Sequence, residues 1–105
     1  MVSHSRVKWS SSARADIGNI SDYLMNEWGK SVLTKFLLKL DRIIYQIIIN
    51  PKQYPEINTR LKIRKYVVTK QNILFYKIKG ETIEIVRLYD TRQDPNKLEI
   101  LFKTD

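Results

Sequence analysis

The sequence predicts an α+β domain of order β-α-α-β-β-β, and three observations support it. Apolar residues recur at helical spacing between residues 12 and 49, and they alternate with polar residues between 61 and 89. Gaps of only two or three residues divide the alternating part, and such gaps cannot hold a crossover helix. The strands should therefore form an antiparallel-dominated sheet, with the two helices as a hairpin on one of its faces.

The first expected elements are a short strand and a helix. Residues 6–9 alternate, which places Val7 and Trp9 on one face. The first helix is expected over residues 12–28, where apolar side chains step by three or four, and Gly29 should end it. Trp9 and Trp28 are both expected in the core, since large aromatic side chains are mostly buried.

A second helix is expected over residues 31–49, with Ser31 as its cap and Asn50 and Pro51 as its stop. Its buried stripe consists of Leu33, Phe36, Leu37, Leu40, Ile43, Ile44 and Ile47. The last turns, residues 43–49, are apolar nearly all round. Part of that surface must be covered, either by the loop expected at residues 51–59 or by a partner chain.

Three further strands are expected over residues 61–69, 73–79 and 83–89, because each run is rich in β-branched and aromatic residues. Residues 70–72 should close the first hairpin, and Gly80 with Glu81 the second. Together with residues 6–9 this makes a four-stranded sheet, whose first strand can pair in either direction. After the sheet, residues 95–101 are expected to form a short helix or, alternatively, an extended tail.

The composition narrows the functional classes. The 105 residues carry 19 lysines and arginines against 11 acidic residues, and this net charge of +8 favours an acidic partner. There is no cysteine, so disulfides are excluded, and the single histidine, His4, argues against a metal site or a Ser-His-Asp triad. No cofactor is expected. No leader or membrane span is visible, so we expect a cytoplasmic protein with no membrane partner.

The basic charge concentrates in the predicted sheet. Between Ile57 and Gly80 the chain has no acidic residue but contains Arg60, Lys62, Arg64, Lys65, Lys70, Lys77 and Lys79. Because the helices should cover one face of the sheet, we expect the other face to be the working surface. Aromatic residues interleave with these cations, and such sets stack nucleic-acid bases, although ordinary cross-strand packing also explains them. Phe75 in particular is expected to face the helices.

Several motifs follow one another along residues 6–95. They are Trp9, A-x-x-D-I-x-x-I-x-x-Y at 13–23, Phe36-x-x-x-Leu40, N-P-K-Q-Y-P at 50–55, I-R-K at 63–65, Y-K-I at 76–78, I-E-I-V-R at 83–87 and R-Q-D-P at 92–95. In order and spacing they resemble the RelE/ParE superfamily, the toxins of type II toxin–antitoxin modules. The R-Q-D-P motif is nearer the ParE, or plasmid-stabilisation, branch than the ribonuclease branch.

The resemblance implies two different activities. ParE-like toxins poison DNA gyrase by binding it, whereas RelE-like toxins enter the ribosomal A site and cleave mRNA. Both kinds are neutralised by a cognate antitoxin that wraps on the toxin in a hetero-oligomer. The leading hypothesis is a ParE-like inhibitor of growth without bond chemistry of its own, and the alternative is a ribosome-dependent mRNA endonuclease. A third interpretation is an inactive basic module whose only partner is its antitoxin.

Candidate site residues come from the basic strands. Cleavage of RNA needs a base for the 2′-OH proton and cations for the phosphate, so the catalytic candidates under the nuclease alternative are Lys62, Arg64 and Arg87. Candidates for target or nucleic-acid contact are Arg64, Tyr66, Arg87, Tyr89 and Arg92. Lys62, Arg64 and Tyr66 should share one face by the strand period of two, and Arg87 should join them with its guanidinium in solvent. The plainer interpretation is a solvated basic strand face.

Acidic residues beside these candidates have structural interpretations. Asp16 and Asp22, near the start of the first helix, suit the helix dipole there. Arg92 and Asp94 stand just after the sheet, where they are expected to pair with each other or to cap the next helix.

Overall fold

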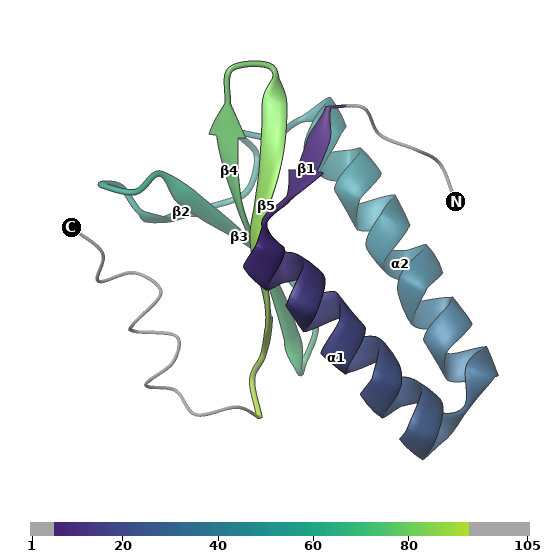
Figure 1. Ribbon diagram of the computed structural model, residues 1–105. Helices are drawn as coiled ribbons and strands as arrows, with labels where there is room; N and C mark the ends of the chain where they lie inside the picture. Colours follow the sequence, from purple (N-terminus) through teal and green to yellow (C-terminus); the bar gives the residue numbers. More distant parts are fainter. Residues whose placement is uncertain (1–5, 93–105) are drawn as a thin grey trace.

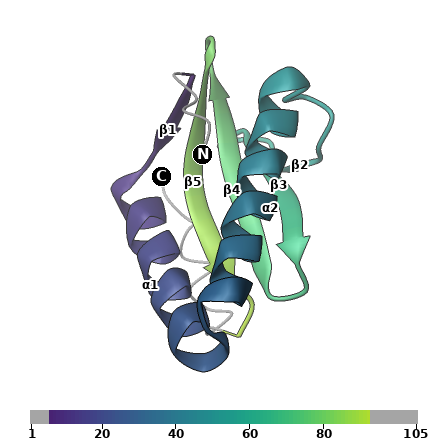
Figure 2. The same ribbon diagram turned by 90° about the vertical axis from the view of Figure 1, so that its right-hand side faces the viewer.

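Two helices pack against one face of a five-stranded sheet in the computed structural model, which describes residues 6–92 (Figure 1). The elements in chain order are β1 (Val7–Trp9), α1 (Ser11–Trp28), α2 (Lys30–Ile49), β2 (Glu56–Asn58), β3 (Ile63–Thr69), β4 (Asn72–Lys79) and β5 (Thr82–Asp90). Figure 2 shows both helices on the same side of the sheet, with α1 nearer β1 and β5 and α2 in front of β4 and β3. The predicted α+β class is confirmed.

The sheet has the order β1-β5-β4-β3-β2. Its centre is the predicted antiparallel meander, since β3 pairs with β4 and β4 with β5 through tight hairpins. Gly80 has a φ of +59° in the second hairpin, a conformation that costs glycine little. At one edge β1 runs parallel to β5, with Val7 opposite Ile83 and Trp9 opposite Ile85. This parallel pair is possible because both helices lie between the two strands in the chain.

A fifth strand is the main departure from the four that the sequence predicts. Residues 56–58, expected within a loop, form β2 and pair antiparallel with β3, with Glu56 opposite Arg64. A strand of three residues carries too little alternation to be distinguished from a loop. The next strand also begins later than predicted, at Ile63, because Lys62 lies in a turn with a φ of +58°. Lys62 therefore does not share a strand face with Arg64.

The helix ends have clear physical causes. The Ser10 hydroxyl accepts a hydrogen bond from the Ala13 backbone N–H at 3.0 Å and donates one to the Val86 carbonyl at 2.7 Å, so the cap of α1 is also tied to β5. Gly29, with a φ of +89°, ends α1 as predicted. Its carbonyl already accepts the Leu33 N–H of α2. The prediction of Ser31 as the cap is therefore wrong, because Gly29 joins the helices directly.

The main core lies between the helices and the sheet. Its buried apolar residues are Ala13, Ile20, Phe36, Leu40, Ile43, Ile44, Ile47, Val68, Leu74, Tyr76, Ile83, Ile85 and Leu88. Trp9 packs against this core as predicted, but Trp28 is 65% exposed and the prediction that it is buried is wrong. Trp28 is the last residue of α1, at the tip of the hairpin, which reaches past the ends of the strands (Figure 2).

A second apolar cluster occupies the other face of the sheet. Ile63, Phe75 and Tyr89 are 5% exposed or less, and Leu61, Ile73 and Val86 pack against them. Phe75 was expected to face the helices, but the strand alternation places Leu74 and Tyr76 there instead. The centre of the face expected to be an open basic surface is thus apolar and buried. No helix among residues 6–92 is long and apolar enough to cross a membrane.

Candidate functional site

Arg64 is held by the segment that leads into β2. Its Nη1 donates to the Tyr54 carbonyl at 2.6 Å and to the Lys52 carbonyl at 3.2 Å, and its Nη2 lies 3.9 Å from the Glu56 carboxylate. Only 18% of the side chain is exposed. Arg64 therefore fastens residues 52–56 to β3, and most of its guanidinium is already occupied by the protein itself.

Arg87 forms an ion pair with Asp16 that is largely enclosed, since the two side chains are 25% and 9% exposed. Its Nε donates to Asp16 Oδ2 at 2.7 Å and its Nη2 to Asp16 Oδ1 at 2.9 Å, while the Leu88 N–H donates to the same Oδ2 at 2.9 Å. Hydrogen bonding to Asp16 raises the pKa of Arg87 above its ordinary value. The expected solvent-exposed guanidinium at this position is wrong, because α1 supplies a buried carboxylate to it.

Sequence reasoning missed this role of Asp16 and assigned the residue to the helix dipole. The spacing along the helix could have revealed that Asp16 is buried. It lies three residues after Ala13 and four before Ile20, on the buried stripe of α1. A carboxylate on an apolar stripe needs a partner, and an arginine in a buried strand is a suitable one. The pair joins α1 to β5, which are far apart in the sequence.

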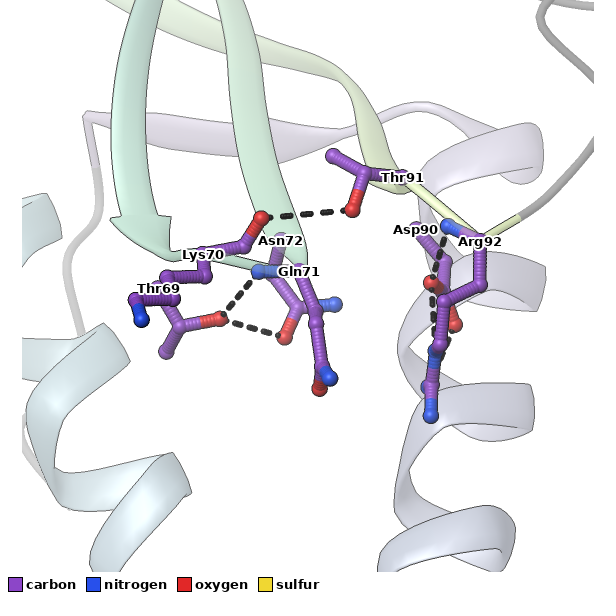
Figure 3. Close-up of polar contacts among 7 residues, drawn as sticks. All are labelled: Thr69, Lys70, Gln71, Asn72, Asp90, Thr91 and Arg92. Atoms are coloured by element: carbon purple, nitrogen blue, oxygen red, sulfur yellow. Dashed lines mark hydrogen bonds and ion pairs between the residues drawn. The ribbon is translucent and has the colours of Figure 1, made fainter.

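Arg92 differs from the other two arginines because it lies at the surface just after β5. Its Nε and Nη2 donate to the two carboxylate oxygens of Asp90 at 2.9 and 2.7 Å, and its backbone N–H donates to the same group at 2.9 Å (Figure 3). The guanidinium carbon also lies 4.2 Å from the centre of the Tyr23 ring on α1. These bonds hold the pKa of Asp90 below its usual range. The expected partner Asp94 lies outside the described residues.

The turn between β3 and β4 supports this position. Thr91 donates its N–H to the Gln71 carbonyl at 2.7 Å. Its hydroxyl donates to the Lys70 carbonyl at 3.2 Å (Figure 3). Within the turn, the Thr69 hydroxyl donates to Asn72 Oδ1 at 3.0 Å. These hydrogen bonds stabilise this end of the sheet. The Arg92 guanidinium is therefore exposed and held in one orientation. Its side chain is 39% exposed.

The three catalytic candidates do not converge. Arg64 lies in β3, opposite Tyr76 of β4, whereas Arg87 lies in β5, opposite Phe75. The intervening strand separates them by two inter-strand spacings, roughly 10 Å. Lys62 lies in the turn before β3 and lines a hollow of about 210 Å³ beside Arg64. Of the three candidates, only Lys62 and Arg64 therefore lie near each other, and the Arg87 side chain points toward α1.

The aromatic candidates also separate. Tyr66 faces the helix side and its ring meets that of Tyr54 edge to face, with 4.7 Å between centroids. Tyr89 belongs to the cluster on the opposite face and is 5% exposed. Among residues 6–92 no group of three or more His, Cys, Asp or Glu side chains is arranged to hold a metal ion.

Comparison with known proteins agrees with this architecture. The family model described as the ParE toxin of type II toxin-antitoxin system, parDE, matches residues 7–95. No curated protein sequence matches. Among solved structures, the chromosomal ParDE TA system from P. aeruginosa superposes with a TM-score of 0.66 at 17% identity, covering 80% of this chain and 92% of that one. The YoeB-YefM complex from Staphylococcus aureus gives a TM-score of 0.59 at 14% identity, covering 83% and 97%.

The two structural likenesses show a shared fold, and the family model matches far more than half of the chain. The parallel β1, the helix hairpin and the antiparallel meander all lie within the matched residues. The chain belongs to the family of ParE toxins of type II toxin–antitoxin systems.

Proposed function

We propose that this type II toxin inhibits growth by binding DNA gyrase, without bond chemistry of its own. The observation that carries the proposal is the state of the three arginines. Arg64 and Arg87 bind backbone carbonyls and a buried carboxylate, so neither is placed to stabilise a phosphate in a cleavage site. Arg92 is the most exposed of the three, and its ion pair with Asp90 lies at the surface, where an anionic partner can compete for the guanidinium.

A cognate antitoxin is the second proposed partner, and we expect the two chains to form a hetero-oligomer in the cytoplasm. The solved relatives include a ParDE system and a YoeB-YefM complex, in which a toxin of this fold has such a partner. In this chain the solvent side of α2 exposes Leu38, Tyr45 and Ile49 by 54–65%. Exposed apolar residues on a protein of net charge +8 favour an amphipathic, acidic segment.

The alternative function is ribosome-dependent cleavage of mRNA. The observation that favours it is a group of cations without carboxylate partners: Lys62 and Lys65 form no ion pair with any described residue. An unpaired lysine is available to contact a phosphate or to transfer a proton. The interpretation as an inactive module bound only by its antitoxin predicts neither activity.

Expression of the toxin without its antitoxin tests these functions. Messenger RNA 5′ ends and the DNA-damage response are measured in the same induced cells. The gyrase proposal expects a damage response with intact transcripts, and the Arg92→Ala variant should weaken it at least as much as Arg87→Ala. Cut transcripts with no early DNA damage would establish the nuclease instead. Unchanged growth in a cell that accumulates folded toxin would contradict both.

A further inference from the structure

Two tyrosines at one edge of the molecule form the wall of an open groove. The rings of Tyr54, before β2, and Tyr66, in β3, meet at an interplanar angle of 69°. Two hollows share this pair. The first, of about 520 Å³, is also lined by Gln46, Ile49, Asn50 and Gln53, and the second, of about 330 Å³, by Pro55, Lys65 and Val67. The pair therefore stands between two adjoining spaces, with polar side chains on both sides.

The segment that carries Tyr54 is held in place before any ligand binds. Arg64 donates to the Tyr54 and Lys52 carbonyls, and the Tyr76 hydroxyl donates to the Pro51 carbonyl at 2.6 Å. Arg64 and Tyr76, which donate these hydrogen bonds, line neither of the two hollows. A tyrosine whose backbone is fixed and whose ring already packs against another ring loses little conformational entropy when a ligand stacks on it. The groove is preorganised for a flat ligand.

The lining has the chemistry of a site for nucleic acid. It contains no carboxylate, and its three amide side chains supply hydrogen-bond donors and acceptors of the kind that read base edges. Lys65 borders one hollow, and Lys52 and Lys62 line the neighbouring hollow of about 210 Å³, whose one carboxylate, Glu56, pairs with Arg64. These lysines form no ion pair with any described residue. Tyrosine faces beside unpaired lysines are the elements of single-strand binding.

We propose that this tyrosine groove binds a short stretch of single-stranded nucleic acid. A base stacks against Tyr66 or Tyr54, amide side chains contact its edge, and the phosphates lie along Lys52 and Lys62, since Lys65 projects from the opposite face of β3. An acidic peptide would also be attracted to the lysines, but its carboxylates have no flat face that could stack on a tyrosine ring beside the amides. This activity goes beyond inhibition of gyrase, because it needs neither gyrase nor the antitoxin.

Fluorescence anisotropy of the purified full chain with short labelled oligo(U) and oligo(dT) tests the proposal. We expect the Tyr66→Ala variant to bind about tenfold more weakly, the loss typical of one stacked base, and Tyr66→Phe to bind like the parent. The matched control is Trp28→Ala, since Trp28 is an exposed aromatic residue at the end of α1 that lines neither hollow. Equal losses for Trp28→Ala and Tyr66→Ala, or equal affinity for duplex and single strand, would overturn the proposal.

Photocrosslinking keeps the test decisive if Tyr66→Ala does not fold. A 5-iodouridine oligonucleotide irradiated with the unmodified protein should attach to the peptide that contains Tyr54 or Tyr66, as read by mass spectrometry. The ratio of oligo(U) to oligo(dT) affinity then tells whether RNA or DNA is the source. Crosslinks confined to other peptides, or an acidic peptide that binds the groove where neither oligonucleotide binds, would show that the groove serves a protein partner.

Discussion

Truncation of Asp16 should be among the most destabilising single changes in this protein. Asp16→Ala removes three hydrogen bonds and leaves the Arg87 guanidinium and the Leu88 N–H without their acceptor. Breaking a buried ion pair from one side costs about 3–5 kcal/mol of unfolding free energy. Because 25% of the Arg87 side chain is exposed, water compensates part of this loss, and we expect about 3 kcal/mol. For a domain of this size that lowers the Tm by roughly 15 °C.

Urea unfolding of Asp16→Ala, Arg87→Ala and the double variant measures this effect. The double variant should be less destabilised than the sum of the single variants by at least about 1 kcal/mol, because each change removes the same pair. Asp22→Ala is the control: it removes an exposed carboxylate from the same helix and should change stability by about 0.5 kcal/mol or less. If Asp16→Ala and Asp22→Ala unfold alike, the pair is not what joins α1 to β5.

Three further predictions concern single side chains. Gly29→Ala should cost about 1 kcal/mol in urea unfolding because its φ is +89°, whereas Gly18→Ala within α1 should gain up to about 1 kcal/mol, since nothing lies within 4 Å of the added Cβ. Burial raises the pKa of Tyr76 to about 12, so absorbance at alkaline pH should show one tyrosine ionising near that value, and Tyr76→Phe should abolish this step. Arg92 lowers the pKa of Asp90, so Asp90 contributes stability above its unfolded pKa of about 4 that is lost as pH falls through the lower folded value. Asp90→Asn should flatten the acid side of the urea midpoint curve.

Hydrophobic periodicity predicted most of the fold, because the long helices and strands show a regular period. The stripe of α2 and the alternation of β3, β4 and β5 each span enough residues to fix a period. The errors lie where the signal is short or depends on tertiary contacts. β2 has three residues, Ser31 loses its role because Gly29 joins the helices, and Trp28 lies beyond the reach of the sheet.

The site was harder to predict because the partners of Arg87 and Arg64 have no local sequence signature. Arg87 pairs with a residue 71 positions away, and no local pattern specifies that contact. A shift of register between Phe75 and Tyr76 changes which side chains of β5 share a row with β4. Arg64 binds backbone carbonyls, which have no sequence signature at all. Only the exposure of Arg92 was anticipated correctly.

Direct binding to gyrase tests the central claim most closely. The purified toxin is titrated onto purified gyrase, and the Kd is compared for the parent, Arg92→Ala, and Lys39→Ala, which removes an exposed cation from α2 instead. We expect tight binding by the parent, a loss of about tenfold or more for Arg92→Ala with only a small fall in Tm, and little change for Lys39→Ala. The fall in Tm is small because the Asp90 ion pair lies at the surface and contributes about 1 kcal/mol or less. Absence of binding by the folded parent, or equal affinity of all three proteins, would contradict the account.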